Sequence, residues 1–212
     1  LHINVKEQNI DMLSLSGHKF HGPKGTGVLY ARQGIPLTNI IEGGAQERGK
    51  RAGTENVPGI MGLAAALKEA CDHIDENTAK VSALRDQLIA GLSQIPHGAL
   101  NGDPVHRLPG NVNFCFEGIE GESLLLLLDQ AGICASSGSA CTSGSLDPSH
   151  VLLAIGRPHE VAHGSLRLSL CEWNTQEDVD HILKEVPRIA AYLRSISPVW
   201  KDLASGKKQF ML

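Results

Sequence analysis

The chain has 212 residues, of which 42% are hydrophobic and 20% are charged, and its formal net charge is −4 with its ten histidines counted as neutral. This composition is typical of a globular protein with one large domain or two small ones, and it excludes the strongly basic character of a nucleic-acid-binding protein. No apolar stretch approaches the length of a transmembrane helix, and the first residues, LHINVKEQ, lack the apolar core of a signal peptide.

The five cysteines are scattered, and no two of them form a Cys-x-x-Cys pair. An odd number without paired spacing argues against a disulfide framework and against a structural zinc site, so no metal is expected. The reducing cytoplasm is therefore the predicted compartment. The chain begins with Leu1 rather than Met, which suggests a fragment or a processed product.

The first third of the chain has the texture of an α/β domain. Alternating apolar residues predict short strands at 10–16 and 26–32, and the glycine- and proline-rich HGPKG separates them. The polar, glycine-rich stretch 42–59 is predicted to be a long functional loop. Apolar side chains at helical spacing then predict helices over about 57–96.

The second part of the chain mixes strands and helices, which indicates a small α+β domain. Its predicted elements are a strand at 111–118, a helix at 121–132, a strand from 133 that leads into a serine- and glycine-rich loop up to 150, a strand at 164–170 and a helix at 175–196. The last helix has Thr175 as its N-cap and Asp178 three residues later. We predict a boundary within the helical zone, with 1–75 as an incomplete piece of a larger α/β domain and 76–212 as the small domain.

The segment SGHKFHGPKGTG contains two lysines and four glycines, which raises the question of a nucleotide loop. A Walker loop needs a lysine directly after its second glycine and then Ser or Thr, but Pro23 precedes Lys24 and glycine follows it. The GTG triplet lacks the third glycine of a dinucleotide fingerprint and precedes a strand. The sequence excludes both nucleotide motifs.

Lys19 lies just after a predicted strand, behind Ser16 and His18. A hydroxyl and an imidazole around a glycine can both reach a phosphate monoester, and a lysine at the mouth of a pocket can form a covalent imine. Spacing alone leaves an exposed basic turn as an equal alternative.

Three further positions are candidates for chemistry. Thr54 lies in a glycine-flanked loop with Arg48, Lys50 and Arg51 nearby, which suits an anion but also suits an ordinary basic loop. Cys141 lies among serines and glycines that have little to pack, so an exposed, reactive thiol in a mobile loop is predicted.

Arg167 stands mid-strand between leucines, where it either faces solvent or holds a carboxylate bidentately. The remaining cysteines are predicted to be structural, with Cys134 on the strand side of its loop as buried core. The others lie in apolar helix or strand patterns: Cys71, Cys115 and Cys171.

SLSGHKFHGPKGTGVLY resembles the cofactor-lysine segment of fold-type I pyridoxal-phosphate enzymes of the class V aminotransferase group, and more narrowly the cysteine desulfurases of iron–sulfur assembly and nitrogen fixation. The resemblance implies that Lys19 binds pyridoxal 5'-phosphate covalently and that Ser16 and His18 bind its phosphate. ERGKRAGTEN resembles the R-x-G-T loop of this family, which implies that Thr54 reaches the cofactor phosphate of a partner subunit in a homodimer.

SSGSACTSG resembles the catalytic loop of the desulfurase group with a long mobile loop, which implies that Cys141 takes the substrate sulfur as a persulfide. GSLRLSL resembles the family's S-x-R-x-S-L strand, which implies that Arg167 binds the substrate α-carboxylate. The implied fold is the end of a large, mostly parallel-sheet domain of the α/β class followed by a small α+β domain that carries the catalytic cysteine.

The implied reaction converts L-cysteine to L-alanine and passes sulfur to an iron–sulfur scaffold protein, for nitrogenase or for general cluster assembly. Family members carry further cofactor-binding residues upstream that have no counterpart here, so the chain is expected to lack an N-terminal half and to bind the cofactor poorly when isolated. Two alternatives remain. One is a selenocysteine lyase or class V aminotransferase, and the other is a non-catalytic dimerisation or sulfur-relay fragment.

Overall fold

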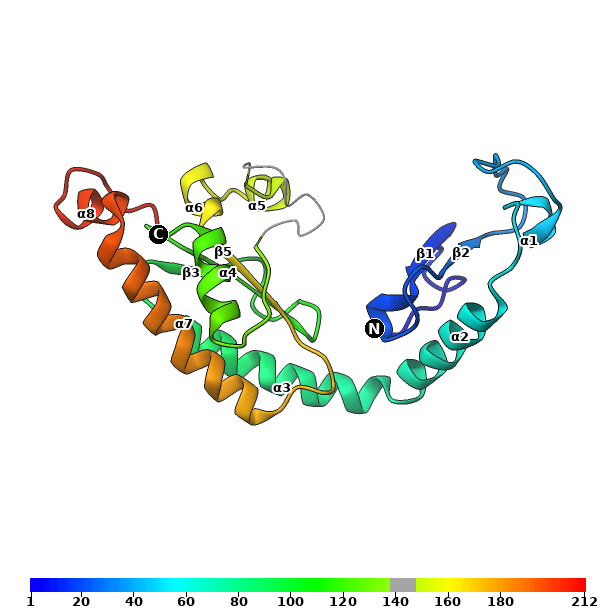
Figure 1. Cartoon of the computed structure of the whole chain (residues 1–212), viewed down its shortest axis with the longest axis horizontal. Helices are drawn as coiled ribbons and strands as arrows, with labels where there is room; N and C mark the ends of the chain where they lie inside the picture. The colour runs from blue at the N-terminus through cyan, green and yellow to red at the C-terminus, as the bar shows by residue number, and fades with distance from the viewer. Residues whose placement is uncertain (138–147) are drawn as a thin grey trace. The chain divides into compact units, whose positions relative to one another are not determined.

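The computed structural model describes residues 1–137 and 148–212. The chain forms two compact units, Leu1–Asp75 and Glu76–Leu212 (Figure 1). In the described part of the chain, no helix is both long enough and apolar enough to cross a membrane.

Unit 1 is built around an antiparallel hairpin of β1 (Met12–Ser16) and β2 (Gly27–Ala31), with Met12 opposite Ala31 and Ser16 opposite Gly27. Both strands confirm the sequence prediction. The 3₁₀ helix η1 (Gly17–Phe20) follows β1 directly. The predicted loop at 42–59 is interrupted by α1 (Gln46–Gly49), a single turn whose two middle residues have positive φ. A turn of four residues is too short to show helical periodicity in the sequence.

The remaining helices of unit 1 bury few side chains. α2 (Val57–Asp72) follows, and α3 (Ile74–Leu92) begins just before the unit ends, which confirms the predicted helical zone. Large apolar side chains of the unit remain exposed, among them Leu29 at 56%, Ile40 at 98% and Met61 at 65%. A two-stranded hairpin is marginally stable by itself, so unit 1 presents an apolar surface that a further layer of protein would stabilise.

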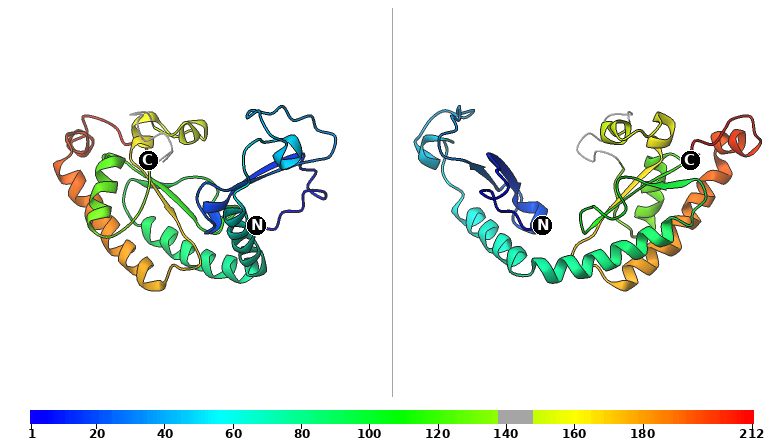
Figure 2. Two further views of the ribbon diagram at one scale, coloured as in Figure 1. Left: turned by 45° about the vertical axis from the view of Figure 1, so that its right-hand side comes forward. Right: turned by 180° about the vertical axis from the view of Figure 1, so that it is seen from behind.

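Unit 2 contains a three-stranded antiparallel sheet in the order β3 (Gly98–Leu100), β4 (Asn111–Phe116), β5 (Ser165–Ser169) (Figure 2). The helices α3, α4 (Gly121–Gln130) and α7 (Gln176–Ile196) share one core with a single face of this sheet. Fully or almost fully buried side chains from the strands and from each of these helices form that core: Leu88, Phe114, Leu124, Leu166 and Val186.

Shorter helices complete unit 2. α5 (His150–Ala154) and α6 (His159–His163) supply Leu152, Val161 and Ala162 to a smaller cluster around Cys115, and α8 (Pro198–Ala204) follows α7. The predicted capping box is confirmed, because the Thr175 backbone N–H donates to Asp178 at 3.0 Å and the Asp178 N–H donates to the Thr175 hydroxyl at 3.3 Å. The strand predicted from residue 133 is wrong, since this segment forms only an isolated bridge between Ser136 and Arg167.

Candidate active site

The Lys19 segment is a tight turn in which Gly17 is buried and the functional groups are exposed. The Gly17 N–H donates to the Thr26 carbonyl at 2.9 Å, and the Gly22 N–H donates to the Gly17 carbonyl at 2.9 Å. Gly17 is buried, and a Cβ there would lie 2.6 Å from the Thr26 hydroxyl oxygen. A side chain at this position would push the turn open, so glycine is required by close packing.

The three predicted cofactor ligands of this turn lie where a ligand could reach them. Ser16, His18 and Lys19 are all exposed. Ser16 precedes η1 in an extended conformation, and its side chain makes no hydrogen bond that caps the start of the helix. Lys24 lies in the turn before β2, within the HGPKG stretch that separates the two predicted strands.

Thr54 is exposed in the same unit, at the end of a loop that its neighbours brace. The Gly53 N–H donates to the Gln46 side-chain oxygen at 3.1 Å, and Arg51 donates to the Gly53 carbonyl at 3.0 Å. Arg51 also lies 3.7 Å from the Glu47 carboxylate. The loop therefore holds Thr54 on a backbone fixed by its own side chains.

Arg167 occupies the middle of β5 in unit 2 and is half-buried. Strand alternation puts Leu166 and Leu168 in the core and Arg167 on the opposite face. Ser136 lies on the free edge of β5, where its N–H donates to the Arg167 carbonyl at 3.1 Å and its carbonyl accepts from the Arg167 N–H at 2.6 Å.

The exposure of the cysteines differs in part from the prediction. Cys141 lies outside the described residues. Cys134 is exposed rather than buried, because the strand expected around it is reduced to the single bridge at Ser136. Cys71 is also exposed, since unit 1 offers α2 little core to pack against.

Cys115 is fully buried in β4 as predicted, and burial raises the pKa of its thiol. Cys171 is half-buried just after β5.

A polar cluster that the sequence analysis missed covers the face of the sheet that carries Arg167. Asn101 is buried at 4% exposure and contacts Asn113, Cys115 and Arg157 through its side-chain amide. One pattern in the sequence could have revealed part of it. In NVNFCF the apolar residues Val112, Phe114 and Phe116 alternate with residues of smaller or more polar type, which marks a second, non-core face.

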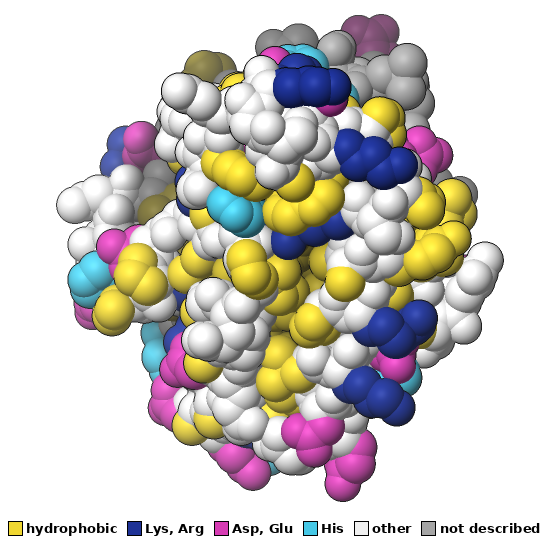
Figure 3. All heavy atoms as spheres, turned by 90° about the vertical axis from the view of Figure 1, so that its left-hand side faces the viewer, with side chains coloured by type: hydrophobic (Ala, Val, Ile, Leu, Met, Phe, Trp, Pro, Cys, Tyr) yellow, Lys and Arg dark blue, Asp and Glu magenta, His cyan; other side chains and the backbone are white. Residues whose placement is uncertain are grey.

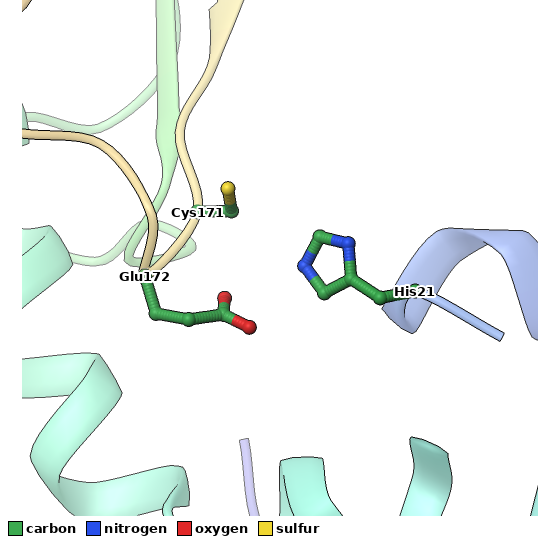
Figure 4. A group of neighbouring side chains, drawn as sticks. All are labelled: His21, Cys171 and Glu172. Carbon is green, nitrogen blue, oxygen red and sulfur yellow. The ribbon is translucent and has the colours of Figure 1, made fainter.

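Two other features carry none of the predicted site residues. A cavity of about 910 Å³ in unit 2 is lined by apolar side chains that include Leu193, Ile196, Leu203 and Phe210, and hydrophobic groups gather at this end of the unit (Figure 3). Figure 4 draws His21, which follows η1, with Cys171 and Glu172, which follow β5. Because His21 belongs to unit 1 and the other two belong to unit 2, we build no metal site from them.

Comparison with known proteins supplies the family. The model of the family described as aminotransferase class-V matches residues 1–182. The chain belongs to the aminotransferase class-V family. This membership confirms the predicted resemblance to the class V aminotransferase group.

Individual members of the class-V family narrow the comparison. The chain is 56% identical over 210 residues to "Cysteine desulfurase IscS" of Clostridium botulinum strain Hall, covering 98% of this chain and 53% of that protein. It is 52% identical over 199 residues to "Cysteine desulfurase NifS" of Azotobacter vinelandii, covering 93% of this chain and 50% of that protein. The chain thus spans about half the length of the curated relatives it matches.

A solved structure agrees with the predicted fold class. The X-ray structure of a NifS-like protein from Rickettsia africae is similar with a TM-score of 0.83 and 32% identity, over 90% of this chain and 50% of that one. The predicted α/β class, as part of a fold-type I enzyme, is confirmed by this similarity and by family membership.

Proposed function

We propose that the protein carrying this chain is a pyridoxal-phosphate-dependent cysteine desulfurase. The single observation that carries the proposal is the glycine-backed turn that exposes Ser16, His18 and Lys19 together, in a chain whose relatives are named cysteine desulfurases. Its substrate would be L-cysteine, and its products would be L-alanine and a protein-bound persulfide.

The donor groups of unit 1 fit the cofactor. Hydroxyl and imidazole groups bind phosphate oxygens, and Ser16, His18 and Thr54 supply two hydroxyls and one imidazole. A primary amine reacts with an aldehyde, and Lys19 supplies it from the same exposed turn. When bound, the cofactor would draw electrons away from the α-carbon of the attached amino acid.

The chain's own residues would divide the remaining work. Lys19 would hold the cofactor and then move a proton at the substrate α-carbon. Arg167 would hold the substrate carboxylate through its guanidinium. The Cys141 sulfur would attack the substrate sulfur, so that a sulfur–sulfur bond forms while the carbon–sulfur bond breaks and its electron pair stays with the carbon that becomes the alanine methyl group.

Association and location follow from the same proposal. The protein would act as a homodimer in which Thr54 serves the phosphate of the partner subunit, and the exposed apolar surface of unit 1 supports such an association. A scaffold protein for iron–sulfur clusters would accept the sulfur. The compartment would be the cytoplasm, and no nucleic acid or membrane would take part.

The test is a matched pair of cysteine variants in the purified protein. Cys141→Ala should abolish alanine release from L-cysteine and remove the persulfide detected by mass spectrometry. Cys134→Ala, which changes an exposed cysteine seven residues earlier in the chain, should leave both unchanged. Full alanine release by Cys141→Ala would overturn the desulfurase assignment and favour a class V aminotransferase or a selenocysteine lyase.

A second candidate is a dimerisation or sulfur-relay module without catalysis of its own. It concerns what these 212 residues do by themselves, since they match about half of each relative described above. The absorbance of pyridoxal phosphate bound to the purified 212-residue chain separates the two. A bound-cofactor band that Lys19→Ala removes argues against the module, whereas sulfur uptake by Cys141 without that band supports it.

A further inference from the structure

The face of the unit 2 sheet that carries Arg167 has a row of polar residues at one level. Asn113 of β4 pairs directly with Arg167 of β5, so their side chains leave the same face. Asn101 continues the row beyond β3, since its N–H donates to the Asn113 carbonyl at 2.8 Å. Ser136 completes the row on the free edge of β5.

Hydrogen bonds along this row run in one direction. The Arg157 Nε donates to the Asn101 Oδ1 at 2.6 Å, and the Asn101 Nδ2 donates to the Asn113 Oδ1 at 2.6 Å. Arg157 also donates to the Leu100 carbonyl at 2.6 Å, which fixes its guanidinium against the edge strand.

The direction is dictated by chemistry rather than by a choice of amide orientation. A guanidinium has donors and no acceptor, so the atom of Asn101 that faces Arg157 must be its oxygen. The NH2 group of Asn101 must then face Asn113, and it also lies 3.2 Å from the Cys115 sulfur, which can accept it. The oxygen of Asn113 is therefore held by Asn101, and the group that Asn113 offers to its other neighbours is its NH2.

The row thus places the NH2 of Asn113 on the same face as the guanidinium of the paired Arg167. Both groups donate, and neither can accept from the other. A carboxylate has two oxygens and accepts from several donors at once, so it fits a site with one charged and one neutral donor. We propose that Asn113 is a second carboxylate-binding residue beside Arg167, and that Asn101 and Arg157 are the positioning residues that present its NH2.

This inference rests on the proposed function, because that proposal makes Arg167 the ligand of the substrate carboxylate. It adds a residue that the motif around Arg167 does not contain. The ligand class is the carboxylate of an α-amino acid. We expect the site to bind the free amino acid in preference to the corresponding amino acid amide.

The first test separates binding from chemistry in steady-state kinetics. Asn113→Ala should raise KM for L-cysteine about 10- to 100-fold, as expected for losing one hydrogen bond to a charged group, with kcat changed little. Asn113→Asp keeps the acceptor for Asn101 but turns the donor into an anion, so its KM should rise further. Asn111→Ala is the matched control, because Asn111 lies two residues earlier on the same face and is bonded to Arg107 instead.

Two outcomes would overturn the inference. One is an unchanged KM in both Asn113 variants. The other is an equal rise in KM for Asn111→Ala, which would show a general weakening of the sheet. If Asn113→Ala fails to fold, Asn113→Asp still tests the inference, because aspartate preserves the size of the side chain and the hydrogen bond from Asn101.

A second test needs no turnover and so distinguishes failure of this site from failure of the desulfurase proposal. In nuclear magnetic resonance spectra of the 212-residue chain, L-alanine should shift the Asn113 NH2 and Arg167 Nε–H signals, and L-alaninamide should not. Those shifts, together with no desulfurase activity in the protein that carries the chain, would support the site and reject the activity. Activity with no L-alanine shift at Asn113 would reject the site and retain the activity.

The positioning role has its own readout. Arg157→Ala removes the donor that orients Asn101, so KM should rise, and the double variant with Asn113→Ala should show no additional rise. Arg157→Lys restores a donor to the Asn101 oxygen and should recover most of the affinity. Additive effects of the two alanine changes, or no recovery by lysine, would assign Arg157 a merely structural role.

Discussion

Arg194 near the end of α7 offers a sharp test of how unit 2 is held together. Its side chain is only 7% exposed, and it donates to three backbone carbonyls: Glu117 at 3.0 Å, Pro96 at 2.7 Å and His97 at 3.0 Å. The guanidinium also lies 4.1 Å from the centre of the Trp200 ring. One side chain thus joins α7 to the chain before β3, to the end of β4 and to α8.

Replacing Arg194 by leucine keeps an apolar stem and removes every donor. The His97 carbonyl keeps the Glu117 N–H at 2.9 Å, so two carbonyls, those of Glu117 and Pro96, lose their donor. Each of these two losses in the interior costs roughly 1–3 kcal/mol, and the lost cation–π contact adds up to about 2 kcal/mol. Part of this is offset, because the charged guanidinium is itself desolvated, which also lowers its pKa. We expect the free energy of unfolding of unit 2 to fall by about 3–5 kcal/mol, the usual cost of breaking a buried charged network.

Arg188→Leu is the matched control on the same helix. Arg188 is 63% exposed and pairs at 2.6 Å with Glu185, whose side chain is 11% exposed, so its loss should cost about 1–2 kcal/mol, less than the loss of Arg194. The assay is urea unfolding followed by Trp200 fluorescence in a Trp173→Phe background, since these are the two tryptophans of the chain. A cost for Arg194→Leu no larger than that for Arg188→Leu would refute the reasoning.

Three further changes test burial, electrostatics and close packing. Cys115 should react with a thiol reagent far more slowly than exposed Cys134 in peptide mapping, because burial hides its sulfur and raises its pKa; equal rates would contradict this. Hydrogen bonds from Asn174 and then from the Thr175 backbone lower the pKa of Asp178, so its stabilising effect is present above its unfolded pKa of about 3.9 and is lost as pH falls through the lower folded value. Asp178→Asn should therefore destabilise α7 at neutral pH by less than about 1 kcal/mol, and the difference in urea midpoint should vanish in acid. Gly17→Ala should cost about 1–3 kcal/mol and speed amide hydrogen exchange in the Lys19 turn, whereas unchanged exchange would show that the turn has room for a methyl group.

Local sequence patterns predicted the elements whose residues repeat regularly. The alternation in 111–116 and 165–169 gave β4 and β5, and the Thr175–Asp178 capping box set the start of α7. The short elements were not predicted from the sequence. β3 has three residues, too few to show a period of two, and it is fixed by pairing with β4 rather than by its own sequence.

The candidate site shows the same division between local and tertiary information. The exposed turn with Ser16, His18 and Lys19 could be read from one segment, because its glycines and polar residues are contiguous. Exposure of Cys134 could not be read, because it depends on whether the following residues pair with β5. The contacts of Asn101 with Asn113 and Arg157 join positions separated by 12 and 56 residues, and the local sequence does not predict such contacts.

The uneven burial of the two units ties the proposed chemistry to association. Unit 2 has a core of strands and helices, whereas unit 1 leaves Leu29, Ile40 and Met61 largely exposed around the hairpin that supports Lys19. Burying one such side chain stabilises by roughly 1.5–3 kcal/mol, so covering this surface would stabilise the hairpin, and a ligand that orders the turn would favour the covered state. By linkage, pyridoxal phosphate should bind more tightly to the associated protein than to a dispersed chain. Its apparent affinity should therefore rise with protein concentration, and an affinity independent of concentration would show that the turn is ordered without a partner.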